Sequence, residues 1–286
     1  MVLGVDYVGT EGLNLPGTLN INDPPAGPGS VQARRPYPNY GTIAYNNQST
    51  LSTYNSLQVK LEKQVSNDFW YMLSYTFSKS ITNMEVPAMG GNGFFNRGLS
   101  AFDVPQNFTV SGGYALPFGK GKRFLGSANR LTDAFVGGWQ YQTITNFHSG
   151  VPYTPTVSRD VANIGVTGGA NAQHPNLIGR SCRKSGSLKN YFILTDFAVP
   201  AAYSFGDSGT DICRGGGFQE VDMSLFKDFR ITEGSRLQFR AEAFNLPNSA
   251  FFNIPSTTTI DTSNGGQVTS TSNQNRQLQF ALKYVF

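Results

Sequence analysis

The chain has 286 residues, and only 14% of them are charged, well below the ~25% that is usual in soluble domains. Aromatic residues reach 13%, while Gly, Asn, Ser and Thr supply much of the polarity, which favours strands and loops over helices. The net charge of +4 is scattered, with its densest group at Lys120, Lys122 and Arg123, so we expect no nucleic-acid partner. No apolar run approaches the ~18 residues that a transmembrane helix requires, and the first residues do not form a secretory signal.

Alternation of apolar and polar residues predicts strands along most of the chain. After an opening run at 2–8, residues 54–65 and 68–80 carry apolar side chains mostly at odd positions and polar ones at even positions. Only Ser66 and Asn67 separate these two runs, which predicts a tight hairpin. The pattern returns, more weakly at its second occurrence, at 108–116, 139–147, 221–229, 236–244 and 276–286. We therefore expect about eight strands.

The links between these strands alternate in length. Those near 10–52, 81–103, 149–217 and 247–275 are long, 117–135 is moderate, and 66–67 and 231–234 are short. Long and short links on opposite sides of a meander are typical of transmembrane barrels, which have long outer loops and short periplasmic turns. The sequence therefore predicts an all-β, antiparallel transmembrane β-barrel meander in contact with outer-membrane lipid.

The charged residues agree with a membrane-facing side and a polar side. On the apolar faces the exceptions are Lys63, Lys79 and Lys227, each close to a strand end, where a lysine can reach the membrane interface. Mid-strand charges such as Lys60 and Arg240 fall on the polar face, which would line a lumen. A soluble sandwich would bury its apolar face and keep it largely free of lysine.

The candidates for chemistry are few. His148 and His174 have no acidic or cysteine neighbour at ligand spacing, so no metal site is expected. Four charged residues of two neighbouring strands are expected to form a ladder of cross-strand ion pairs, not a catalytic pair: Asp222, Asp228, Arg240 and Glu242. We expect no enzyme activity, no catalytic residue and no cofactor.

The two cysteines, Cys182 and Cys213, do not form a zinc pattern. They suit one loop-closing disulfide in an oxidising compartment, or two unrelated thiols. Because both fall within one long polar segment, we favour the disulfide.

A set of segments stands in a fixed order along the chain: "RRPYPNYGTI", "YNSLQVKLEKQVSNDFWYMLSYTFSKSITN", "FDVPQNFTVSGGYALPFGKGKRF", "VGGWQ", "SGVPYT" and "DMSLFKDFRITEGSRLQFRAEAFNLPNSAFFN". Together they resemble the C-terminal barrel of TonB-dependent receptors, and most closely the subgroup with a carboxypeptidase-regulatory-like N-terminal domain. The resemblance implies an outer-membrane receptor for active uptake of a scarce nutrient, such as a glycan, peptide or metal chelate. Such barrels have about 22 strands around a plugged lumen and receive energy from the TonB complex through a segment ahead of the plug.

The resemblance also implies that residues 1–286 are the C-terminal part of such a barrel. A signal peptide, the plug and the N-terminal strands are not found in this sequence. The final strand fits the same class, in which the last residue is commonly Phe and the barrel-assembly machinery reads the alternate apolar positions. Those positions are Phe280, Leu282, Tyr284 and Phe286.

Two other functions remain open at this point. The chain could be a complete small outer-membrane barrel that serves as an anchor, adhesin or autotransporter translocator. It could also be a soluble β-rich binding module whose exposed aromatic residues hold a ligand. The ligand-binding residues are unknown, and the long links at 81–103, 149–217 and 247–275 are the parts expected to face a ligand.

Overall fold

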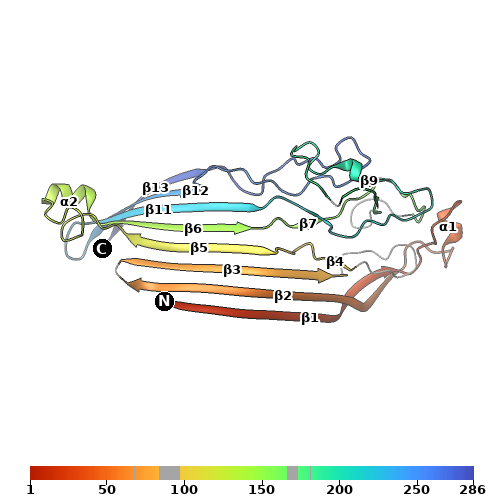
Figure 1. The fold of residues 1–286 in the computed structure, drawn as a ribbon, viewed down its shortest axis with the longest axis horizontal. Helices are drawn as coiled ribbons and strands as arrows, with labels where there is room; N and C mark the ends of the chain where they lie inside the picture. Colours follow the sequence, from red (N-terminus) through yellow and green to blue (C-terminus); the bar gives the residue numbers. More distant parts are fainter. Residues whose placement is uncertain (67, 84–96, 166–172, 181) are drawn as a thin grey trace.

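The computed structural model describes residues 1–66, 68–83, 97–165, 173–180 and 182–286. Its main feature is one long antiparallel sheet in which eight strands follow each other in the order β1-β2-β3-β5-β6-β11-β12-β13 (Figure 1). These strands are β1 (Val2–Asn20), β2 (Ala44–Ser66), β3 (Phe69–Thr82), β5 (Gln106–Ala115), β6 (Trp139–His148), β11 (Phe218–Arg230), β12 (Arg236–Phe244) and β13 (Gln277–Val285). All eight predicted strands are confirmed. Within the described residues the sheet stays open, with β1 and β13 at its edges.

The remaining elements are short. Strand β4 (Gly98–Leu99) pairs with β3, and two small ladders join β7 (Pro152–Tyr153) with β10 (Cys213–Arg214) and β8 (Asn176–Leu177) with β9 (Phe197–Ala198). The helices among the described residues are α1 (Val31–Arg34), α2 (Arg130–Val136) and a 3-10 turn at Leu194–Asp196. None of the described helices has the length and apolar character needed to cross a membrane.

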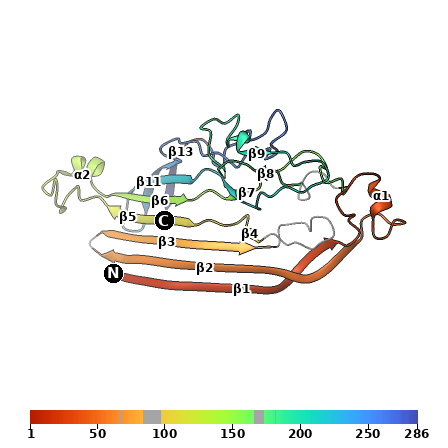
Figure 2. The same ribbon diagram turned by 45° about the vertical axis from the view of Figure 1, so that its right-hand side comes forward.

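The links gather by length at the two ends of the sheet (Figures 1 and 2). The β2–β3 and β11–β12 turns and the link that holds α2 lie at one end, which we call the turn end. The long links, which carry α1, β4 and β7 to β10, lie at the other end, which we call the loop end. The predicted separation of short turns and long loops is therefore confirmed. The predicted link at 81–103 falls largely outside the described residues.

Strands β1 and β2 are much longer than predicted. Their pairing continues through Asn20 and Ala44, well beyond the alternating parts at 2–8 and 54–65. The extension, rich in Gly, Asn and Thr, carries register shifts around Leu15, where the Thr50 hydroxyl donates to the Leu15 carbonyl at 2.7 Å. Apolar and polar residues alternate along a strand only where its two faces have different surroundings. A strand with similar surroundings on both faces has no such alternation in its sequence.

The pairing register places the alternating side chains of all eight strands on two consistent faces. Leu57 lies beside Phe77 and Tyr7, and at the other edge Leu282 lies beside Phe239. We call the side that these residues share the apolar face and the other side the polar face. The closing strand follows its prediction: Leu278, Phe280, Leu282 and Tyr284 lie on the apolar face, and Gln277, Gln279, Ala281 and Lys283 lie on the polar face.

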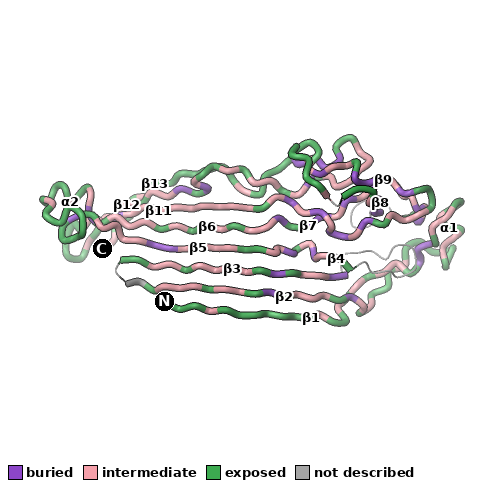
Figure 3. The backbone as a smooth tube through the Cα atoms, in the orientation of Figure 1, coloured by how far each residue is buried: buried purple, intermediate pink, exposed green. Residues whose placement is uncertain are grey.

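The buried core lies in the long links and not in the sheet (Figure 3). Of the buried apolar residues among those described, Ala243 is the one that belongs to a long strand. The central cluster comprises Tyr153, Phe192, Phe197 and Cys213, all within the β6–β11 link. A sheet with large apolar side chains and no core of its own must obtain its apolar environment from outside the described chain.

Candidate functional site

The apolar face of the sheet exposes large side chains along its whole width. Large side chains remain exposed from one edge of the sheet to the other, including Leu3 on β1, Phe77 on β3 and Phe280 on β13, which is 69% exposed. Leaving apolar surface in water costs ~25 cal/mol per Å², and soluble monomers rarely expose a continuous apolar surface of this extent. The face is therefore suited to contact with lipid.

Aromatic rings lie near both ends of this face. At the turn end, Phe69 contacts Tyr114 with ring centroids 5.9 Å apart, and towards the loop end Tyr75 contacts Phe108 at 6.5 Å. Phe69 and Phe77 begin and end the aromatic series on β3. At ~3.3 Å per residue they are about 26 Å apart along the strand, similar to the ~25 Å apolar band of outer-membrane barrels. The aromatic residues of β3 therefore extend across most of such a band.

A hollow of about 690 Å³ lies on the same face, near the turn end. It arises because Gly112, which has no side chain, sits in the register between Tyr71 and Thr143. Val110 and Tyr141 contribute to its walls. The apolar and aromatic lining suits a hydrocarbon chain better than a polar ligand.

Two lysines of the apolar face have partners. The Lys63 ammonium lies 5.1 Å from the centroid of the Phe69 ring at the turn end. Lys227 is buried, and its ammonium donates to the backbone carbonyl of Ala134 at 2.7 Å and lies 5.0 Å from the centroid of the Phe229 ring. The predicted placement of these lysines near strand ends is confirmed, and for Lys227 the partner is helix α2 instead of water.

The predicted ladder of cross-strand ion pairs on the polar face is wrong. Arg240 lies directly opposite Phe226 and Ala281, so no carboxylate faces it, and its Nε donates to Gln238 at 2.7 Å. Glu242 instead accepts from the Ser224 hydroxyl at 3.2 Å. Asp222 accepts from the backbone N–H of Asn245, and Asp228 accepts from Gln238 and pairs with Arg236 at 3.9 Å. The face is a hydrogen-bonded polar surface, as a hydrated lumen requires.

The long links pack into one body at the loop end, which we call the loop body (residues 21–43, 97–105, 149–165, 173–180, 182–217 and 245–276). Two of its links are joined by a bridge between Thr156 and Thr259 and by the hydrogen bonds from Ser158 to Asp261 at 2.8 and 3.0 Å. Arg214 joins a third link through its ion pair with the buried Asp103 at 2.5 Å. The fourth link is joined by the guanidinium of Arg34, which donates to the Asn163 carbonyl.

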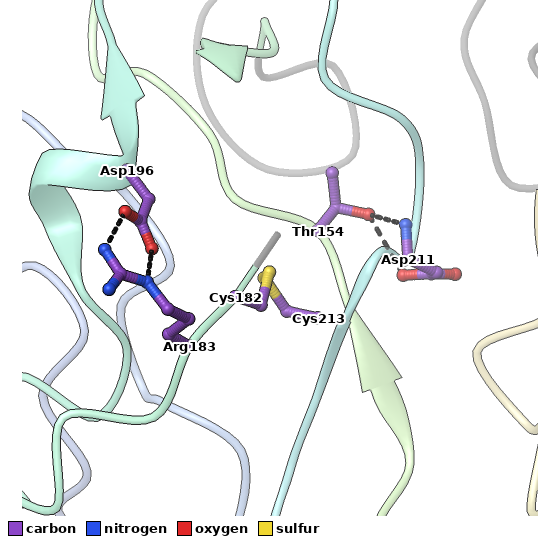
Figure 4. Close-up of a disulfide and its surroundings, with 6 residues drawn as sticks. All are labelled: Thr154, Cys182, Arg183, Asp196, Asp211 and Cys213. Atoms are coloured by element: carbon purple, nitrogen blue, oxygen red, sulfur yellow. Dashed lines mark hydrogen bonds and ion pairs between the residues drawn. A yellow bond between two sulfur atoms is a disulfide. The ribbon is translucent and has the colours of Figure 1, made fainter. Parts of the chain in front are cut away.

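The two cysteines lie within this body (Figure 4). The structure joins Cys182 and Cys213 by a disulfide whose Cα atoms are 5.1 Å apart, and Cys213 belongs to the buried cluster. Next to it, Arg183 donates from Nε and Nη2 to the two carboxylate oxygens of Asp196 at 2.9 and 2.5 Å. These hydrogen bonds hold the pKa of Asp196 below its ordinary value. On the other side, the Thr154 hydroxyl donates to Asp211 at 3.0 Å.

A cleft of about 630 Å³ opens in the loop body between the β1–β2 link and the β6–β11 link. Arg159 and the half-exposed ring of Tyr203 contribute to its lining, with Val199 and Pro200 as apolar wall. Asp160 also lines it but is occupied by the fold, because it accepts from the backbone N–H of Ile164 at 2.9 Å and from the Gln173 side chain. A cation, an aromatic ring and a short apolar wall are groups that can contact a polar organic ligand.

The histidines do not converge on a common site. The His148 ring stacks on Phe218 at 4.8 Å, and Nδ1 of the buried His174 lies 2.8 Å from the Ser208 carbonyl oxygen. Burial lowers the pKa of His174. Among the described residues, no group of three or more His, Cys, Asp or Glu side chains is arranged to hold a metal ion.

Residues 1–279 match the protein family described as "Outer membrane beta barrel domain". The chain belongs to this family. The outer-membrane barrel is also similar to the crystal structure of the outer membrane transporter YddB from Escherichia coli, at 12% identity and a TM-score of 0.47. That alignment covers 99% of the outer-membrane barrel chain and 30% of the transporter. A search among curated proteins found no match.

Membership of this family places the chain in the outer membrane and orients its surfaces. The apolar face contacts lipid, the polar face lines the lumen, the turn end is periplasmic and the loop end is external. The outer-membrane barrel thus has two functional surfaces: a lipid-facing sheet and an external loop body.

Two features were missed by sequence reasoning. Helix α2 has an Asn129 N-cap and ends at Gly137, which together were an available signal for a short helix. The core of the loop body gave no periodic pattern, because its members lie without regular spacing in the β6–β11 link and, at Ile254 and Ile260, in the β12–β13 link.

Proposed function

We propose that the chain is the C-terminal part of a TonB-dependent receptor that takes up a scarce nutrient across the outer membrane. The observation that carries this proposal is the open sheet, which has β1 and β13 as edges among the described residues. In hydrocarbon an unpaired strand edge leaves backbone N–H and C=O groups without partners, at a cost of several kcal/mol each. A larger barrel that supplies further strands would pair both edges.

The polar face and the loop body support transport better than an anchoring role. The inward groups include the exposed ion pair of Lys60 and Glu62 at 2.9 Å, which suits a hydrated interior or a protein plug. At the external end the cleft beside Arg159 and Tyr203 would contact the nutrient. Within this proposal the chain has no catalytic step, the TonB complex acts through a part outside this sequence, and the barrel-assembly machinery recognises the final strand.

Strand cross-linking distinguishes a larger barrel from a complete small one. In a small barrel of eight strands β1 must pair with β13, so a cysteine replacing Val5 should form a disulfide with one of the cysteines placed singly at positions 279–283. In the proposed receptor these strands face other neighbours and no such disulfide forms in the membrane. As a positive control, cysteines replacing Leu237 and Tyr284, which lie opposite each other, should cross-link. Efficient β1–β13 cross-linking would remove the receptor proposal.

Energy dependence provides the functional test. Cells that express the full-length receptor would be supplied with labelled peptides, oligosaccharides and iron chelates, with and without functional TonB. We expect one of these three classes of compound to accumulate only in cells with functional TonB. Its accumulation should fall when Tyr203 is replaced by Ala. Accumulation that is independent of TonB would contradict the proposal.

A further inference from the structure

The link between β5 and β6, residues 116–138, folds into an ordered lobe at the periplasmic end. We call it the β5–β6 lobe. The Asn129 side chain caps α2 by accepting from Thr132 N at 2.8 Å, and Asp133 accepts from the backbone N–H of Lys120 at 2.6 Å. Gly119 approaches Gly137 so closely that a Cβ on Gly119 would lie 2.6 Å from the Gly137 Cα. Figures 1 and 2 show α2 projecting past the strand ends.

The lobe is fastened to the lipid-facing side of the sheet. The Trp139 indole donates to the Phe135 carbonyl at 2.8 Å, and the Lys227 ammonium donates to the Ala134 carbonyl at 2.7 Å. Trp139 and Lys227 are paired in the register, on the same face as the neighbouring pair of Tyr141 and Leu225. Both attachments of the helix therefore come from the lipid-facing side and not from the lumen.

Several large apolar side chains of the lobe are exposed. Leu131 and Phe135 are four residues apart and so share one side of α2, and they are 75% and 76% exposed. Three further side chains are exposed in the same lobe: Phe118, Phe124 and Leu125. Figure 3 colours most residues around α2 as exposed. The lobe therefore presents exposed apolar groups next to its attachment points at Trp139 and Lys227.

The lobe also concentrates positive charge. It contains Lys120, Lys122, Arg123 and Arg130. Lys122 pairs with Asp68 of the β2–β3 turn at 2.5 Å, while the other three are exposed. The Arg123 guanidinium lies 5.5 Å from the centroid of the Phe124 ring, which places a cation and an apolar ring side by side. Aromatic and aliphatic groups next to exposed cations are the composition of a membrane-interface anchor.

We propose that the β5–β6 lobe is an interfacial anchor that binds anionic phospholipids of the periplasmic leaflet. Leu131 and Phe135 enter the boundary between headgroups and acyl chains, while Lys120, Arg123 and Arg130 contact phosphate groups. The lobe is continuous with the lipid-facing sheet, which favours lipid over a periplasmic protein as its occupant. The proposal rests on membrane location and is independent of what the barrel transports.

Fluorescence quenching tests the apolar half of the proposal. A bimane label on Leu131→Cys, and separately on Phe135→Cys, is introduced into the full-length protein folded in vesicles of phosphatidylethanolamine and phosphatidylglycerol. Lipids brominated near the headgroup end of their chains should quench both labels several-fold more than a label on Glu233→Cys. Position 233 is the matched control, because it lies in the β11–β12 turn at the same end of the sheet. Equal, weak quenching at 131, 135 and 233 would overturn the proposal and leave a protein partner as the alternative occupant.

Charge removal tests the phosphate half. Quenching at position 131 should increase when phosphatidylglycerol replaces part of a phosphatidylcholine bilayer, and the triple variant K120Q, R123Q, R130Q should lose that increase. The control triple variant R180Q, K189Q, R276Q removes three exposed cations at the external end and should keep it. If both triple variants respond equally to the anionic lipid, binding of phosphate by the lobe is refuted.

Discussion

The lipid-facing assignment makes a direct energetic prediction at Leu73. This residue lies on β3 midway between Phe69 and Phe77, about 13 Å along the strand from each at ~3.3 Å per residue. Its neighbours in the register are Leu61 and Val110, so the site is in the middle of the apolar face. Replacement by Arg therefore places a cation close to the bilayer midplane.

We expect Leu73→Arg to lower the free energy of unfolding by about 2–4 kcal/mol, the cost of a midplane Arg on the lipid side of a barrel. The matched control is Thr76→Arg on the same strand, whose neighbours Gln58 and Asn107 are polar and uncharged. Because that side chain points to the hydrated lumen, its cost should stay below about 1 kcal/mol.

The assay is guanidinium unfolding of the full-length protein in lipid vesicles, followed by tryptophan fluorescence. Both variants carry the same added charge on the same strand. The difference between their free energies of unfolding therefore reports which face of the sheet contacts lipid. Equal destabilisation of the two variants, or a larger loss for Thr76→Arg, would refute the assignment of the apolar face to lipid.

Three further predictions concern the terminus and the loop body. Deleting Phe286, which is 93% exposed, should lower the amount of folded barrel in the outer membrane several-fold, whereas Lys283→Gln on the lumen face should not; normal assembly of the deletion would count against recognition of the final strand. Replacing Cys182 and Cys213 by Ser should lower the stability of the loop body by about 3–4 kcal/mol, as expected for a disulfide that closes a loop of this length. In the unfolded wild-type protein, free thiols should be detected only after reduction. Because burial holds the folded-state pKa of His174 below 6.5, the unfolded chain binds more protons as pH falls below that value, so loop-body stability should fall there. Limited proteolysis across this range should show the loss in the wild type and a weaker pH effect in His174→Gln.

The spanning strands were predictable from the sequence because the membrane imposes a different environment on each face. At Leu57, Phe77 and Leu282 the surroundings alternate from residue to residue, and the sequence alternates with them. The extension of β1 to Asn20 was not predictable in this way, since its Gly, Asn and Thr residues do not alternate between apolar and polar side chains, although the ladder continues through it.

Contacts between distant links were beyond the reach of sequence patterns. The partners of Arg240 depend on a register that sets it against Phe226, and an offset of two residues along β11 would have placed Asp228 there instead. Burial of Lys227 depends on α2, whose carbonyls reach it from a separate link. The pairing of Arg214 with Asp103 joins positions 111 residues apart. Such contacts follow from the fold and carry no local pattern.

Accessibility of the β3 side chains in the bilayer tests the central claim most directly. Nitroxide labels would be placed singly at each position from 71 to 77 of the full-length protein, and their collisions with oxygen and with a water-soluble nickel chelate measured. If the apolar face contacts lipid, labels at 71, 73, 75 and 77 should collide often with oxygen and rarely with the nickel chelate. Labels at 72, 74 and 76 should collide less with oxygen, and either collide with the nickel chelate in a hydrated lumen or with neither reagent where protein covers them. An accessibility pattern without this two-residue period, or with the even positions in lipid, would contradict the account.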